Sequence, residues 1–178
     1  MKKWKVESDF IHHNLRCVVV MQTMGHRCGY VGVSANHPLY GKSYSDKCLP
    51  FNDIEGQSIG KRGIIPVAFM TVENGLVSPD VYFDVHGGIT FADGGVGSKY
   101  PVESDLWWFG FDCAHCNDGI DLETAYKYNL MDEETYKRLK ELESIFSDCE
   151  CRSKEYVENE CKSLAEQLAS ISSMGRVE

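Results

Sequence analysis

Residues 15–33, with the sequence LRCVVVMQTMGHRCGYVGV, decide the fold. Residues 15–21 and 29–33 are two runs rich in valine, and β-branched residues favour strands. The segment between them contains Gly25, so the two runs predict an antiparallel hairpin with a longer loop. The loop QTMGHRC then stands at the tip of the hairpin and carries His26 and Arg27.

Four further short segments read as strands, because glycine, proline, asparagine or aspartate bounds each of them. Pro66 lacks a backbone donor, so the segment that contains it is expected either at a sheet edge or as a strand shortened from its N-terminal side. Residues 37–62 hold several prolines and glycines with little periodicity, and a connection of that length is usually functional. The four predicted strands are residues 64–72, 81–85, 88–92 and 106–112.

From Asp132 onward the apolar spacing is that of helices. Asp132 and Ser153 are N-cap candidates, and they predict one helix over residues 132–147 and a second helix after Ser153. The second helix carries one narrow apolar stripe, which favours a homo-oligomer with a symmetric dimer as the default. The stripe consists of Val157, Cys161, Leu164, Leu168 and Ile171.

The fold class that follows is α+β, with a single domain over residues 1–178. A mainly antiparallel sheet is expected in the strand-rich residues 1–118. Two C-terminal helices are expected within residues 130–172, packed on the sheet or on a neighbouring subunit.

Composition narrows the range of partners. The chain has 18 Lys and Arg residues against 27 Asp and Glu residues, which gives a net charge of −9. This negative charge repels the phosphate backbone of long nucleic acids. No apolar run approaches the roughly 20 residues that cross a bilayer, and no signal peptide is evident. Together with eight cysteines that read as free thiols, this predicts a cytoplasmic protein without membrane or long nucleic acid as a partner.

Histidine placement is the most informative chemical feature. His26, His37, His86 and His115 each lie near a predicted strand end. Imidazole is suited to proton transfer and to metal ligation near neutral pH, so we expect at least two of these histidines to share one ligand site.

The segment LWWFGFDCAHCND, residues 106–118, concentrates aromatic and acidic side chains. Trp107 and Trp108 must point to opposite faces of a strand, so that either both pack in the core or one stacks on a nucleobase. Asp112, His115 and Asp118 follow at intervals of three, and such a set can orient an imidazole or bind a divalent ion.

Positive residues in the predicted loops suggest a small phosphate ligand. Arg27 and Lys42 can supply charge-assisted donors, and Tyr30 and Tyr40 can supply rings or hydroxyls. The alternative is that these charges are ordinary solvated loop residues.

Five segments resemble a family of small, functionally unassigned proteins encoded in bacteriophage and prophage genomes. They are GHRCGYVGV, HPLYGKSY, VHGGITFA, WWFGFDCAH and YVENECKSLAEQL. The resemblance implies a phage accessory protein in the host cytoplasm. Small proteins of this kind often counter host defence, some of them by sequestering or cleaving nucleotide immune signals.

The leading hypothesis is therefore a protein that sequesters a small nucleotide-derived ligand, such as a cyclic ADP-ribose-like molecule or a cyclic dinucleotide. Arg27 and Lys42 would hold phosphates, Tyr40 or Trp108 would stack on the base, and the histidines would donate hydrogen bonds. This hypothesis assigns no cofactor and no metal. The expected ligand-binding residues are His26, Arg27, Tyr30, His37, Tyr40, Lys42, His86, Trp108, Asp112 and His115.

Two alternatives stay open. The first is a hydrolase that cleaves a phosphodiester or pyrophosphate bond of such a nucleotide with His26, His86, Asp112 and His115. Two histidines would act as acid and base, or His86, Asp112 and His115 would hold a metal. The second is a protein-interaction module that uses the C-terminal helices and needs no pocket.

Overall fold

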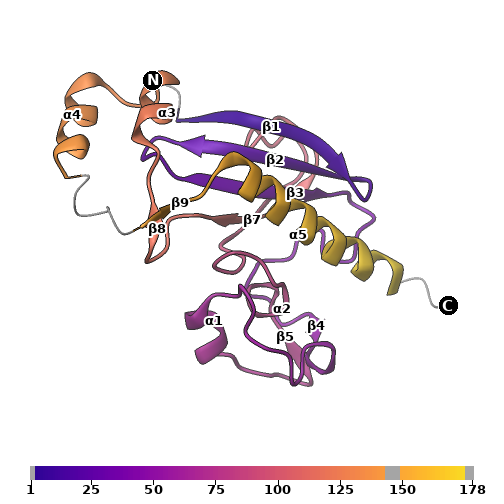
Figure 1. Ribbon diagram of the computed structural model, residues 1–178. Helices are drawn as coiled ribbons and strands as arrows, with labels where there is room; N and C mark the ends of the chain where they lie inside the picture. Colours follow the sequence, from indigo (N-terminus) through magenta and orange to yellow (C-terminus); the bar gives the residue numbers. More distant parts are fainter. Residues whose placement is uncertain (1–2, 143–148, 175–178) are drawn as a thin grey trace.

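The structure is a computed structural model that describes residues 3–142 and 149–174. Its centre is a five-stranded sheet in the spatial order β1-β2-β3-β7-β6, in which every neighbouring pair runs antiparallel (Figure 1). This sheet and the helix packed on it confirm the α+β class. The strands are β1 Trp4–His12, β2 Leu15–Gln22, β3 Arg27–Val33, β6 Phe91–Gly94 and β7 Trp107–Asp112.

The predicted hairpin is confirmed, since β2 pairs antiparallel with β3. Strand β1 was not expected from the sequence, because Lys5, Glu7 and Asp9 interrupt its apolar residues. It joins β2 through His13 and Asn14, whose φ angles of 47° and 61° fit the two-residue turn that hairpins prefer.

The long C-terminal helix α5, Lys154–Met174, lies across β1, β2 and β3 (Figure 1). Its predicted N-cap is confirmed, because the Ser153 hydroxyl accepts the backbone N–H of Tyr156 at 3.1 Å. The apolar stripe from Val157 to Ile171 lies in the core beneath the helix, against this chain's own sheet. No described helix has the length and apolar content of a bilayer-crossing segment.

Helices α3, Leu122–Lys127, and α4, Glu133–Glu141, pack on each other beside the sheet. The Asp132 carboxylate accepts the backbone N–H of Thr135 at 2.7 Å, which confirms the predicted cap of α4. The last part of the predicted helix, residues 143–148, lies outside the described residues. Strands β8, Asp118–Gly119, and β9, Glu150–Cys151, form a short parallel pair.

A smaller group of elements lies on one side of the sheet (Figure 1). Two strand predictions are wrong in this group. Residues 64–72 begin with a helix, and residues 81–85 overlap the end of a second helix and extend beyond it. Pro66 and Pro79 stand in first helical turns, where a missing N–H costs nothing. The elements are β4 Leu49–Pro50, the 3-10 helix η1 Phe51–Asp53, α1 Ile64–Ala68, β5 Leu76–Val77 and α2 Pro79–Tyr82.

The predicted strand over residues 88–92 is shifted, because β6 begins only at Phe91. Gly87 and Gly88 have φ angles of 68° and 86°, which take the backbone out of the extended region before the strand. The prediction for residues 106–112 is confirmed, since β7 begins at Trp107. Trp107 and Trp108 pack on opposite faces of the sheet, as expected.

Candidate histidine and carboxylate site

A buried carboxylate, that of Asp118, organises the densest polar cluster at the end of β7. Its side chain is 2% exposed. The Oδ2 atom lies 2.8 Å from His86 Nε2 and accepts the backbone N–H of His115 at 3.0 Å. The Oδ1 atom accepts the Arg152 Nε–H at 2.9 Å. Burial alone would raise the pKa of Asp118, but the hydrogen bonds from His86 and Arg152 outweigh it and the pKa is lowered.

His86 is held from three sides. Its Nδ1 atom lies 3.0 Å from the hydroxyl of Tyr156, opposite the bond from Nε2 to Asp118. Its backbone N–H donates to Glu160 Oε2 at 3.0 Å, and the other oxygen of Glu160 pairs with Lys61. Burial, with the Glu160 charge adding to it, raises the pKa of Tyr156 to about 12. The Tyr156 hydroxyl is therefore a neutral partner that fixes the orientation of the His86 ring.

His115 points a ring nitrogen at the same carboxylate oxygen. Its Nδ1 atom lies 3.4 Å from Asp118 Oδ2, is buried, and makes no hydrogen bond to any described residue. The side chain as a whole is 35% exposed, so the rest of the ring reaches solvent. The rings of His86 and His115 are 5.4 Å apart and nearly perpendicular. Two imidazoles thus face one buried carboxylate oxygen.

Local backbone geometry explains how these side chains meet. Gly87 has no side chain, and a Cβ there would lie 2.0 Å from Cε1 of His115, so the ring occupies the space that glycine leaves open. Asn117 adopts a φ of 80°, which turns the chain between His115 and Asp118. The parallel pairing of β8 with β9 then brings Arg152 beside Asp118.

Three residues that the sequence analysis singled out, His86, His115 and Asp118, lie together in the structure. His86 and His115 meet at Asp118, and Asp112 Oδ1 lies 4.0 Å from His115 Nδ1. The Asp112 carboxylate accepts hydrogen bonds from Thr90 Oγ1 at 2.8 Å and from the Ala114 N–H at 3.2 Å. Asp112 is therefore a neighbour of the cluster and not a member of it.

A shallow hollow of about 380 Å³ lies on the other side of Asp112 and brings in two further expected residues. Its lining includes His26, Tyr30 and Asp112. Burial lowers the pKa of His26, although the Asp112 charge opposes that effect. Tyr30 is 4% exposed, and its hydroxyl bonds to that of Tyr100. His26 is half-buried and Tyr30 is buried, so the hollow offers a ligand little of either side chain.

Arg27 makes internal contacts. Its side chain is 7% exposed and forms ion pairs with Glu7 at 2.7 Å and Asp121 at 2.8 Å. A third donor of its guanidinium bonds to the backbone oxygen of Arg152 at 3.0 Å. All three nitrogens of the Arg27 guanidinium are thus bonded to other parts of the chain, and the side chain is too buried for the expected phosphate-binding role.

Trp108 and His37 are also internal. Trp108 is 0% exposed, so neither face of its ring can stack on a ligand. His37 is 6% exposed, with Nε2 at 3.0 Å from the backbone oxygen of Leu168 and Nδ1 accepting the N–H of Leu39. Both residues therefore make contacts inside the fold and are not accessible to a ligand.

Tyr40 and Lys42 lie apart from the histidine cluster. The Tyr40 hydroxyl donates to the backbone oxygen of Asp105 at 3.3 Å, and its ring lies 6.1 Å from that of Trp107. The backbone oxygen of Lys42 accepts the Trp107 indole N–H, while its own side chain is exposed. These two residues remain accessible, but they do not converge with Arg27.

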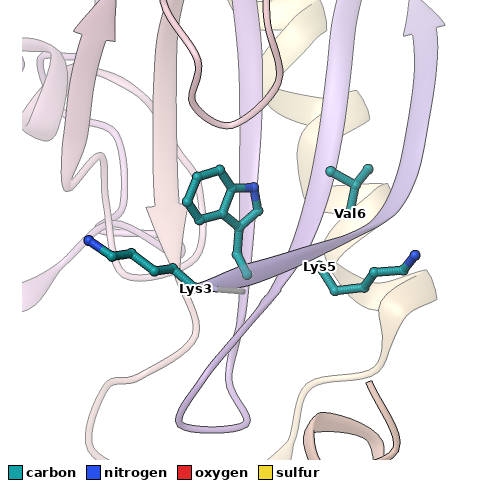
Figure 2. A pocket seen from close by; sticks show the side chains of 4 residues that line it. Lys3, Lys5 and Val6 are labelled. Carbon is teal, nitrogen blue, oxygen red and sulfur yellow. The ribbon is translucent and has the colours of Figure 1, made fainter. Parts of the chain in front are cut away.

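A second hollow, of about 410 Å³, lies along β1 and is lined by Lys3, Trp4, Lys5 and Val6. Figure 2 shows that the side chains of Lys3 and Lys5 extend away from each other on either side of it. The Trp4 indole donates to the backbone oxygen of Pro101 at 3.0 Å. The hollow's lining offers an aromatic ring and two cations, with neither a histidine nor a carboxylate among its residues.

The chain was compared with family models, with curated proteins and with solved structures, and none of them matches it. The argument for function therefore depends on the geometry of the cluster.

Proposed function

We propose that the protein is a hydrolase that cleaves a phosphodiester or pyrophosphate bond of a small nucleotide-type molecule at the His86, His115 and Asp118 cluster. The observation that carries this proposal is that both imidazoles face one oxygen of a buried carboxylate, at 2.8 and 3.4 Å. Buried polar atoms usually have a hydrogen-bond partner, whereas here the Nδ1 atom of His115 is left without one in the described chain.

The two histidines differ in exposure and in hydrogen bonding. His86 is 12% exposed and has both ring nitrogens engaged, so it serves to hold the cluster together. His115 is 35% exposed, and its Nε2 atom makes no hydrogen bond within the described residues. His115 is therefore the group that can reach a substrate and exchange a proton with it.

The chemical step is a displacement at phosphorus. A water molecule forms the new P–O bond and loses a proton to His115, while the bond to the leaving oxygen breaks and that oxygen takes up a proton from solvent. Two cations lie beside the cluster, and each is paired with a carboxylate: Lys61, 55% exposed, with Glu160, and Arg152 with both Asp118 and Glu150.

The test incubates the purified protein with a panel of cyclic dinucleotides, cyclic ADP-ribose-like molecules and dinucleoside pyrophosphates. The resemblance to phage proteins makes host nucleotide signals the first compounds to include. Product in molar excess over protein, lost in His115→Asn, is the expected result. His13→Asn is the matched control, because His13 is an exposed histidine in a turn where asparagine is favoured.

Sequestration without cleavage is the second candidate, and the hollow along β1 favours it. Stacking on an aromatic ring and charge-assisted bonds to phosphate are what a nucleotide needs, and Lys3, Trp4 and Lys5 supply both. In this case the ligand is released intact and in proportion to protein after denaturation. Lys3→Ala with Lys5→Ala abolishes that retention, while His115→Asn leaves it unchanged.

These outcomes separate the candidates by mass spectrometry alone. Excess product that depends on His115 supports the hydrolase, and intact ligand that depends on the two lysines supports sequestration. If no compound in a broad panel is retained or altered, both fail and the protein-interaction hypothesis is favoured.

A further inference from the structure

We propose that His86 Nε2, His115 Nδ1 and Asp118 Oδ2 form a binding site for one divalent transition-metal ion. This inference deepens the proposed hydrolase and depends on it for its chemistry, but binding of the ion is measured without any substrate. Two imidazoles and one carboxylate are a donor set that takes zinc, iron or manganese and leaves coordination positions open for water or substrate.

The distances between the donor atoms fit such an ion. Tetrahedral zinc with bonds of about 2.0–2.1 Å places its ligand atoms about 3.3 Å from each other. Asp118 Oδ2 lies 2.8 Å from His86 Nε2 and 3.4 Å from His115 Nδ1. All three residues offer donor atoms within 4.8 Å of one another. The two distances to Asp118 Oδ2 therefore lie within about 0.5 Å of the separation that tetrahedral zinc requires.

The buried Nδ1 atom of His115 is the second observation that points to a ligand. It makes no hydrogen bond with the described residues, although a buried polar atom of this kind normally has a partner. An imidazole lone pair aimed at a carboxylate oxygen 3.4 Å away gains nothing from that contact unless a proton or a cation lies between them. A metal ion satisfies both atoms at once.

The groups behind the three donors are those that metal sites use to orient their ligands. The Nδ1 atom of His86 is fixed by the Tyr156 hydroxyl at 3.0 Å, and Asp118 Oδ1 is fixed by Arg152 at 2.9 Å. Such outer hydrogen bonds set the ring orientation and the basicity of the ligands. Asp112, with Oδ1 at 4.0 Å from His115 Nδ1, stands where a further carboxylate can contact the ion or its water.

The proposed ion gives the hydrolase its nucleophile. Water bound to a divalent metal ionises near neutral pH, so that one proton passes from the water to solvent and the resulting hydroxide forms the new bond to phosphorus. With Nδ1 bound to the ion, His115 carries its own proton on Nε2 and takes the role of a ligand in place of that of a base. The leaving oxygen keeps the electron pair of the broken P–O bond and takes a proton from solvent. No oxidant or reductant takes part.

A second group of possible ligands tests the assignment. His12, His13 and Glu166 also approach one another at the β1–β2 turn, with His12 Nε2 at 2.9 Å from Glu166 Oε1. These side chains are 30%, 53% and 57% exposed, and within the described residues no buried group bonds to them. The double variant His12→Asn with His13→Asn is therefore the matched control for the loss of histidines.

The experiment titrates the full-length metal-free protein with Zn²⁺ against a chromogenic chelator, and with Co²⁺ in the visible range. We expect one high-affinity ion per chain. His115→Asn should weaken zinc binding more than 100-fold, because it removes a ligand, and His115 makes no side-chain hydrogen bond whose loss would endanger folding. Tyr156→Phe should weaken it by roughly 10- to 100-fold. The His12 and His13 double variant should bind as the wild type does.

Three results would overturn the assignment. The first is that zinc shows no saturable binding. The second is that the His12 and His13 double variant loses the high-affinity ion while His115→Asn keeps it. The third is a sulfur-to-cobalt charge-transfer band, which would assign the ion to the free cysteines. If the ion binds as expected and no compound is hydrolysed, the metal site stands and the hydrolase fails. If hydrolysis depends on His115 in protein that binds no ion, the metal site fails and acid–base catalysis stands.

Discussion

Gly87→Ala is the sharpest test of the arrangement of the two histidines. A Cβ at this position would lie 2.0 Å from Cε1 and 2.3 Å from Nε2 of His115, whereas non-bonded carbon atoms rest about 3.5–4.0 Å apart. The ring must therefore move by more than about 1 Å, since the backbone of Gly87 is fixed by its bond to the Lys61 oxygen. A displacement of that size at a reacting or ligating group costs on the order of 100-fold.

The same substitution carries a backbone penalty that must be separated from the effect on the ring. Gly87 has a φ of 68°, and a residue with a Cβ pays about 1–2 kcal/mol in that region. For a chain of this length, 1 kcal/mol corresponds to about 2–4 °C in Tm, so Gly87→Ala should lower Tm by about 2–8 °C. Gly75→Ala is the matched control, because Gly75 has a φ of 74° and no atom within 4 Å of its virtual Cβ.

Thermal unfolding, zinc titration and turnover are measured on both variants. Both should lose similar stability, and only Gly87→Ala should lose zinc affinity and turnover, each by about 100-fold. If the two variants bind zinc and turn over substrate equally well, the His115 ring does not occupy the position on which the site depends, and the reasoning fails.

Three further predictions address the framework around the site. Burial would raise the pKa of Asp121, but the hydrogen bonds from Arg27 and Thr124 outweigh burial and lower it below the usual value of 3.8. The ionised carboxylate therefore stabilises the fold above about pH 4, and this contribution is lost as the pH falls. Asp121→Asn should therefore flatten the dependence of unfolding free energy on pH between about 2 and 5, and an unchanged denaturation profile contradicts this. Trp108→Ala should cost about 3–5 kcal/mol in urea unfolding because its ring is fully buried, and a cost near zero would mean that the ring is free for a ligand. Ser153→Ala should cost about 0.5–2 kcal/mol and Ser153→Asn much less, and equal losses in the two variants would exclude the cap.

The sequence predicted the elements whose patterns are long and regular. Strands β2, β3 and β7 follow from their β-branched and aromatic runs, and α4 and α5 begin at the predicted caps Asp132 and Ser153. Short apolar runs were misassigned. Residues 64–72 read equally well as a strand or a buried helix, and the exposure of Ile64 and Ile65, at 74% and 72%, shows that the run fits neither buried pattern.

The candidate site was predictable only in part. Glycine-rich turns beside strand ends marked His86 and His115, and the interval of three marked Asp118. The direction in which a side chain points was not predictable, since it depends on partners far along the chain. Arg27 resembles a free loop cation until Glu7 and Asp121, which are 20 and 94 residues away, appear beside it.

The site forms where it does because the C-terminal segment supplies two of its side chains. This contribution was the feature least predictable from the sequence. Arg152 follows β9 and Tyr156 lies in the first turn of α5, and they fix Asp118 and His86 respectively. The same helix buries the next residue, Val157, and then Cys161 one turn further on, in the core against the sheet. Docking of α5 on the sheet therefore also completes the polar cluster, because Tyr156 cannot reach His86 unless Val157 is in the core. The cluster consequently depends on the core for its geometry, and variants that loosen the helix should disturb the site before the sheet itself unfolds.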